Sequence, residues 1–116
     1  MVLVSLTAAT ICFNGMCAPA LIGKDTPTGI YQLRNIQTRA PGYNGDILLF
    51  HETKDYWFAI HRVYTLNPKQ RRVERLRSDN PKDRLITMGC INVMPDIYEQ
   101  LVKCCADEQV NIHRLF

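Results

Sequence analysis

The sequence has no hydrophobic run that reaches the roughly 20 apolar residues needed to span a bilayer, so no membrane span is expected. It has no internal repeat and no low-complexity stretch, which argues against repeat arrays and disordered linkers. No Cys-x-x-Cys motif or spaced Cys/His set is present, so neither a metal site nor a cofactor is expected. The formal net charge is only +3 and no nucleic-acid-binding motif occurs, which disfavours a nucleic-acid partner.

What is present fits one small domain. The chain has 116 residues, 47% of them hydrophobic, which allows a single modest core over residues 1–116. The first ten residues superficially resemble a signal peptide but lack its positively charged beginning. We therefore expect no cleavable signal here, and interpret the chain as a mature domain or one exported by another route.

The basic residues are concentrated in one segment. Residues 67–86 hold seven Lys or Arg and three acids, a balance of +4, and the remainder of the chain sums to −1. Pro68 and Pro81 stand near the ends of this segment, and a short helix is expected around Arg71–Arg77. A polar insertion of this length in a small domain is typical of a lid or binding loop, which we assign to residues 67–84.

Elsewhere the pattern is dominated by short strands. Pro95 and Asp96 begin the one clear helix, because proline suits the first helical turn and an acid suits its positive end. This helix is expected to run to about Cys105. The fold class is therefore mostly β, a sandwich or barrel of short, mainly antiparallel strands. The expected strands are Val2–Leu6, Thr10–Phe13, Met16–Leu21, Ile30–Asn35, Ile47–Phe50, Trp57–Tyr64 and Val110–Leu115.

Four of the five cysteines have structural interpretations. Asn14-Gly15 is a strong signal for a two-residue hairpin turn, which places Cys12 opposite Cys17 within reach of a disulfide. A bridge, which implies an oxidising compartment, and a pair of buried apolar thiols both remain open. Cys104 and Cys105 share one helix face with apolar residues, and we expect them to pack in the core.

Cys90 is the candidate nucleophile. Gly89 precedes it, which permits a tight bend and close approach of a substrate, and neighbouring backbone N–H groups suit an oxyanion. A histidine must activate the thiol, and of the three present His61 is preferred over His51. On spacing alone, a structural role for Cys90 is favoured over a catalytic one, and His61 need be no more than an ordinary strand histidine.

The motifs around these residues resemble the L,D-transpeptidase catalytic domain (YkuD family). Thr87-Met88-Gly89-Cys90-Ile91-Asn92 matches that family's Ser/Thr-x-Gly-Cys motif with its apolar residue and Asn or Arg, and Ile60-His61 matches its strand histidine. Upstream, residues 26–29 match its Thr-Pro-Thr-Gly sequence. The three matches occur in the right order over almost the whole chain.

The resemblance implies a mechanism. Cys90, as a thiolate balanced by His61, attacks the bond between residue 3 and the terminal D-Ala of a peptidoglycan tetrapeptide stem. D-Ala leaves, a thioester remains, and an amine on a second stem forms a 3→3 crosslink or exchange product. The resemblance assigns backbone N–H groups at Gly89 and Cys90 to the oxyanion hole, and the site loop to Thr87 and Asn92. A backbone carbonyl is the family's usual partner for the histidine.

The sequence departs from the family pattern in two places. The separation of His61 from Cys90, 29 positions, is longer than in many members, and the excess falls in the basic segment. Arg62 stands where small residues are common, so an altered entrance is expected. Candidate substrate-binding residues are Arg62, Trp57, Arg72 and Arg75.

The implied location is the periplasm or cell envelope, and the implied partner is the peptidoglycan stem. The alternatives are an L,D-carboxypeptidase or cell-wall-targeting effector toxin using the same site with water, and, more remotely, a non-catalytic binding module.

Overall fold

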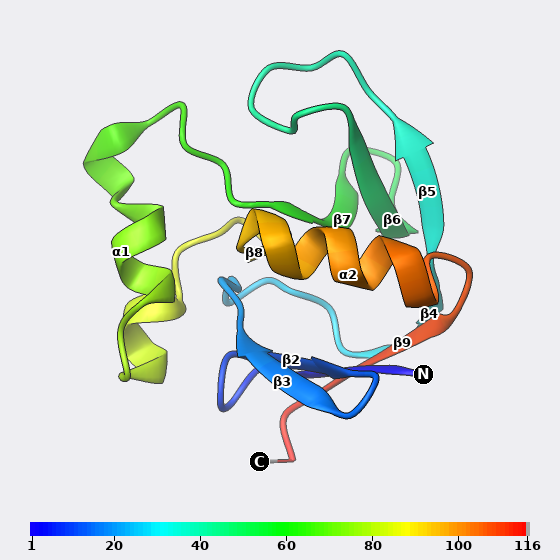
Figure 1. Ribbon diagram of the computed structural model, residues 1–116, viewed down its shortest axis with the longest axis horizontal. Coiled ribbons are helices and arrows are strands. Elements are labelled where there is room, and N and C mark those ends of the chain that lie inside the picture. Colours follow the sequence, from blue (N-terminus) through cyan, green and yellow to red (C-terminus); the bar gives the residue numbers. More distant parts are fainter. Residues whose placement is uncertain (116) are drawn as a thin grey trace.

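Two β-sheets form the framework of the computed structural model, which describes residues 1–115 (Figure 1). A five-stranded sheet has the order β3-β2-β1-β9-β4, and a four-stranded sheet has the order β5-β6-β7-β8. The strands are β1 (Val2–Ser5), β2 (Thr10–Phe13), β3 (Met16–Pro19), β4 (Gly29–Gln32), β5 (Arg34–Gln37), β6 (Asp46–Glu52), β7 (Trp57–Arg62), β8 (Ile91–Val93) and β9 (Gln109–His113).

The expected fold class, mostly β with short and mainly antiparallel strands, is confirmed. Five strand pairings are antiparallel, and the two parallel ones join β1 to β9 and β7 to β8. The single strand expected over Ile30–Asn35 is wrong, because the chain passes from one sheet to the other within it. Leu33 is the residue between β4 and β5, and it is buried in the core at this crossing.

The long helix α2 (Pro95–Cys105) crosses the middle of the molecule, with β5 and β6 above it and β2, β3 and β9 below it (Figure 1). It begins with Pro95 at the first turn, as expected. Tyr98, Leu101 and Cys105 point from it into the main core, which includes residues of both sheets. Within the described residues, no helix is long and apolar enough to cross a membrane.

The insertion, residues 67–84, is folded and packed. It consists of η1 (Pro68–Gln70), α1 (Arg72–Leu76) and η2 (Pro81–Arg84), and α1 lies at the left of Figure 1. Leu76 packs in a second apolar cluster with Leu21 and Val63. The buried Arg84 guanidinium donates to the carbonyls of Ala8 and Ala9. The insertion is therefore held to the framework at two points.

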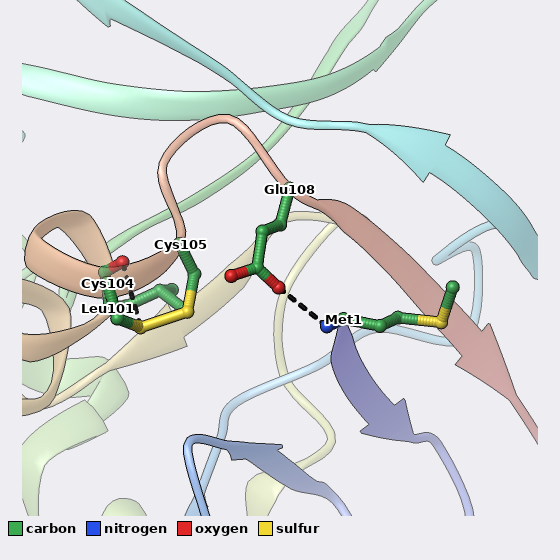
Figure 2. Close-up of a disulfide and its surroundings, with 5 residues drawn as sticks. All are labelled: Met1, Leu101, Cys104, Cys105 and Glu108. Carbon is green, nitrogen blue, oxygen red and sulfur yellow. Dashed lines mark hydrogen bonds and ion pairs between the residues drawn. A yellow bond between two sulfur atoms is a disulfide. The ribbon is translucent and has the colours of Figure 1, made fainter.

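Four cysteines form two disulfides. Cys12 and Cys17 face each other across the β2–β3 hairpin and are bonded, with Cα atoms 4.0 Å apart. Cys104 and Cys105 are also bonded to each other, at the end of α2, as Figure 2 shows. Their packing in or against the core agrees with the sequence interpretation, but their bond was not expected from it. An apolar helix face does not reveal a bond between neighbouring residues.

Candidate active site

The parallel pairing of β7 with β8 positions the candidate site. In its register His61 lies opposite Asn92, and Cys90 is the residue just before β8 begins. Residues 29 positions apart in the sequence are thereby brought to one sheet edge.

The loop before β8 is held by two threonine hydroxyls. Thr87 Oγ1 donates to the Cys90 carbonyl at 2.6 Å and accepts from the Gly89 N–H at 3.1 Å. Thr26 Oγ1 donates to the Gly89 carbonyl at 3.0 Å and accepts from the Gly23 N–H at 2.9 Å. Both backbone polar groups of Gly89 are therefore engaged.

Gly89 itself cannot readily be replaced. Its φ is +131°, a conformation that residues with a Cβ rarely adopt. A Cβ at this position would lie 2.3 Å from the Phe58 ring. The bend that presents Cys90 depends on this glycine.

These contacts change the expected oxyanion donors. The Gly89 N–H was one of two candidates, but in the structure it donates to Thr87. The Cys90 N–H belongs to the peptide whose carbonyl is bound by Thr26. In a trans peptide the N–H points opposite to the C=O, so Thr26 fixes the direction of the Cys90 N–H.

His61 is 3% exposed, and its hydrogen bonds define its tautomer. Nδ1 lies 2.7 Å from the Arg62 carbonyl, which can only accept, so Nδ1 carries the proton. Nε2 is then unprotonated and available as a base. Burial lowers the pKa of His61 to about 4, and the Arg72 charge contributes, while the bond to Arg62 acts in the opposite direction. The imidazole is therefore neutral near pH 7.

Asn92 is fully buried and lies between the histidine and the insertion. Its Oδ1 accepts from the Tyr64 N–H at 3.1 Å and from Arg72 Nη1 at 2.9 Å. Two donors at Oδ1 orient the amide so that Nδ2 faces His61 Nε2, 3.4 Å away. The chain of contacts Arg72–Asn92–His61 thus links α1 to the base.

The Cys90 thiol is protonated in this arrangement. Burial raises its pKa, while a backbone hydrogen bond from Ala59 and the charge of Arg72 lower it. Its sulfur donates to the Trp57 carbonyl at 3.7 Å. The structure therefore favours a neutral thiol beside a neutral imidazole, in place of the thiolate expected from sequence.

Two cavities meet at the Cys90 thiol and the His61 ring, with Tyr43 lining both. The smaller cavity, about 160 Å³, is completed by Tyr56, Tyr64, Arg72, Thr87 and Met88. The larger cavity, about 390 Å³, is mainly apolar and is completed by Ile36, Gln37, Thr38, Ala40, Ile47, Trp57 and Ala59.

The four expected substrate-binding residues are divided by the structure. Arg72 lines the smaller cavity and Trp57 the larger one. Arg62 does not line either: its guanidinium pairs with Asp46 and Glu99.

Arg75 also faces elsewhere, because it donates to the backbone carbonyls of Gln70 and Asp83 and lines a separate surface groove. His51 lies in a third cavity, over β4 to β6, which does not include Cys90.

Some contributing residues were not assigned from sequence. Tyr43 and Tyr64 line the cavities, but no periodicity connects them, since they come from separate loops. Thr26 was noted only as part of a motif. Within residues 1–115, no cluster of three or more His, Cys, Asp or Glu side chains is arranged to hold a metal ion.

Comparison with known proteins gives structural but no sequence relatives. No protein-family model and no curated protein matches the sequence. Among solved structures, the chain resembles an L,D-transpeptidase from Stackebrandtia nassauensis, with TM-score 0.57 and 15% identity over 98% of this chain and 56% of that one. An L,D-transpeptidase from Mycobacterium smegmatis matches with TM-score 0.56 and 15% identity over 97% of this chain and 57% of that one.

A third match is Mycobacterium tuberculosis L,D-transpeptidase 1, with TM-score 0.53 and 16% identity over 97% of this chain and 60% of that one. The chain thus spans little more than half the length of these proteins. At such low identity the likeness concerns the fold, and almost every residue of this chain takes part in it. The chain therefore has an L,D-transpeptidase-like fold.

Proposed function

We propose that this domain is a cysteine acyltransferase of the L,D-transpeptidase type, acting on peptidoglycan tetrapeptide stems. One observation carries the proposal: a single free thiol, Cys90, shares two cavities with a histidine whose Nε2 is a free-base acceptor. The fold adds support, because proteins called L,D-transpeptidases share it.

In the first half-reaction, Cys90 Sγ attacks the carbonyl of stem residue 3 while His61 Nε2 takes the thiol proton. A C–S bond forms, and the imidazolium then gives its proton to the amine of the departing D-Ala as the C–N bond breaks. A thioester on Cys90 remains. The carbonyl of Arg62 holds the imidazolium in place through Nδ1.

The developing oxyanion needs a donor fixed before the reaction. The Cys90 N–H meets this need, since Thr26 and Thr87 hold the peptide groups on either side of it. The Gly89 N–H serves the loop instead.

In the second half-reaction, an amine attacks the thioester and passes a proton to His61 Nε2. The C–N bond forms, the C–S bond breaks, and the proton returns to the Cys90 sulfur. Two cavities that meet at the sulfur suit a reaction with two partners: one for the acyl chain and one for the amine. A 3→3 crosslink results when the amine belongs to a second stem.

The neutral resting pair makes His61 a general base. Its pKa of about 4 keeps the base form available down to mildly acidic pH. The two disulfides are compatible with an oxidising compartment such as the periplasm or the cell envelope, where the proposed substrate is found.

The test is incubation of the protein with purified tetrapeptide muropeptides, with products resolved by mass. Crosslinked dimers together with released D-Ala are expected. Tripeptides alone would identify an L,D-carboxypeptidase using the same site, and unchanged substrate would indicate a binding module. Cys90→Ala is expected to abolish product formation, and a mass increment on Cys90 should mark the thioester in the wild type. Full activity of Cys90→Ala would refute the proposal.

A further inference from the structure

The smaller cavity contains a cation whose partners are all neutral. Arg72 Nη1 donates to Asn92 Oδ1 and Nε donates to Gln70 Oε1, and its guanidinium carbon lies 5.5 Å from the centre of the Tyr64 ring. Within residues 1–115, no acidic side chain forms an ion pair with Arg72 or lines this cavity. Arg62 differs from Arg72, because its guanidinium pairs with two carboxylates.

A partly buried guanidinium without a counter-ion has an unmet electrostatic demand. The pKa of Arg72 is lowered, mainly by burial. Its guanidinium nevertheless remains charged near pH 7. Removing a charge from water costs free energy unless an opposite charge compensates. A ligand carboxylate would supply that charge, and its planar oxygens suit a guanidinium.

The small volume of the smaller cavity limits the size of the ligand group that carries the carboxylate. At about 160 Å³ it is below the volumes of about 300–1,000 Å³ typical of pockets for larger ligands. Cys90 and Arg72 both line this small cavity, so the reacting amine and the carboxylate must be close together in the ligand. An α-amino acid, with both groups on one carbon, has that geometry.

The same cavity serves both half-reactions. The leaving amine and the attacking amine occupy equivalent positions at the carbonyl. Attack of an amine on the thioester is the reverse of the step in which the thioester forms from the amide. The remaining acyl chain then lies on the other side, where the larger apolar cavity is found.

We propose that Arg72 is the specificity-determining residue for the amine partner: it binds the carboxylate on the carbon that bears the leaving or attacking amine. This inference rests on the proposed function and names the class of amine used by that site. Free α-amino acids, and side-chain termini carrying an amine and a carboxylate on one carbon, are then acceptors. Simple amines and α-amino amides are poor ones.

The test measures acyl exchange with D-alanine or D-alaninamide as acceptor, with products quantified by mass. The wild type is expected to favour D-alanine by about tenfold or more, because a charge-assisted hydrogen bond is lost with the amide. Arg72→Gln is expected to remove that preference, mainly by reducing the D-alanine reaction. Arg77→Gln is the matched control: it removes one positive charge from an exposed position of the same insertion and should retain the preference.

Comparing two acceptors separates specificity from damage. Arg72→Gln also loses a contact to Asn92, which would slow both acceptors alike. An unchanged ratio in Arg72→Gln, or no preference in the wild type, would overturn the proposal.

Binding to the Cys90→Ala protein distinguishes failure of this inference from failure of the proposed function. A tetrapeptide with a free terminal carboxylate is expected to bind about tenfold or more tightly than its terminal amide, and only while Arg72 is present. If this Arg72-dependent preference in binding is found but the wild type shows no turnover, the carboxylate site is supported and the proposed acyl transfer is refuted. Equal binding of both peptides, or binding of neither, would refute the carboxylate site.

Discussion

The two sheets each contain one parallel strand pair, and each pair places a histidine opposite a polar residue. In β7 and β8, His61 lies opposite Asn92, whereas in β1 and β9, His113 lies opposite Ser5. Within residues 1–115, only the β7–β8 pair adjoins a free thiol, Cys90, and His61 lines the two cavities that meet there. A histidine in a parallel register is thus not sufficient for a site.

Three surroundings distinguish the β7–β8 pair. A glycine-bent loop presents Cys90, a carbonyl fixes the tautomer of His61, and the insertion delivers Arg72. The β1–β9 pair instead forms the centre of the five-stranded sheet, with residues such as Val2, Val4 and Ile112 in the core. We interpret the four-stranded sheet, which contains β7 and β8, as the sheet that carries the site. The five-stranded sheet is then its structural support, and we call it the framework sheet below.

The largest expected effect comes from replacing His61 with alanine, and the same replacement at His113 is the comparison. His61→Ala is expected to lower kcat/KM for tetrapeptide by about 10²–10⁴-fold, because it removes the general base. His113→Ala should leave the rate nearly unchanged. Steady-state release of D-Ala measures both. Equal losses in the two variants would contradict the assignment of the site to one sheet.

The next effect concerns stability against pH. The folded pKa of His61, about 4, is below its ordinary value of 6.5, so folding favours the neutral ring. The stability that the neutral His61 contributes to the free energy of unfolding is fully present above pH 6.5. It is lost as the pH falls towards 4, because the histidine of the unfolded chain binds a proton before the folded one does. The expected loss between pH 7 and pH 4 is about 3 kcal/mol.

Urea unfolding at several pH values measures this contribution. The difference between wild type and His61→Gln isolates it from the carboxylates, which titrate in both proteins. A parallel decline in wild type and His61→Gln would show that burial of His61 is not responsible.

The framework sheet is expected to affect stability without affecting chemistry. The bond between Cys12 and Cys17 closes a short loop in the β2–β3 hairpin. Its removal in a Cys12→Ser/Cys17→Ser double variant is expected to cost about 2 kcal/mol of unfolding free energy by the loop-entropy relation. Urea midpoints measure the cost, and kcat should be unchanged below the unfolding transition. A fall in kcat with the fold intact would link this hairpin to the site.

The smallest effect concerns two threonines, one in each region. Thr26→Val is expected to lower kcat by about tenfold with KM unchanged, because it releases the Gly89 carbonyl and loosens the direction of the Cys90 N–H. Thr26→Ser, which keeps the hydroxyl, should have a kcat close to that of the wild type. Thr7→Val removes a hydroxyl that bonds the Arg114 carbonyl beside the framework sheet, and should leave kcat unchanged. A rise in KM alone for Thr26→Val would argue against a positioning role.

Sequence reasoning predicted most of the local structure but not where the elements cross or pair. The hairpin at Asn14-Gly15 and the helix beginning at Pro95 follow from local conformational preferences. The division of Ile30–Asn35 between two sheets does not, because its alternation is continuous while its partners are β9 and β6.

The arginines of the insertion show the same limit. Arg72 and Arg75 are three positions apart in one helix, a spacing that predicts a shared face. Only Arg72 reaches the cavity, because Arg75 is bound to the backbone of Gln70 and Asp83. Composition reveals a basic segment, and tertiary contacts select one of its charges.

By itself the sequence determined the strand and helix tendencies, the hairpin turn, and the identity of Cys90 and His61 as candidate partners. Those features depend on residues a few positions apart. Only the tertiary structure decided the parallel register that sets His61 against Asn92, the tautomer of His61, and the entry of Arg72 into the smaller cavity. These depend on packing between segments distant in the chain, which no local preference specifies.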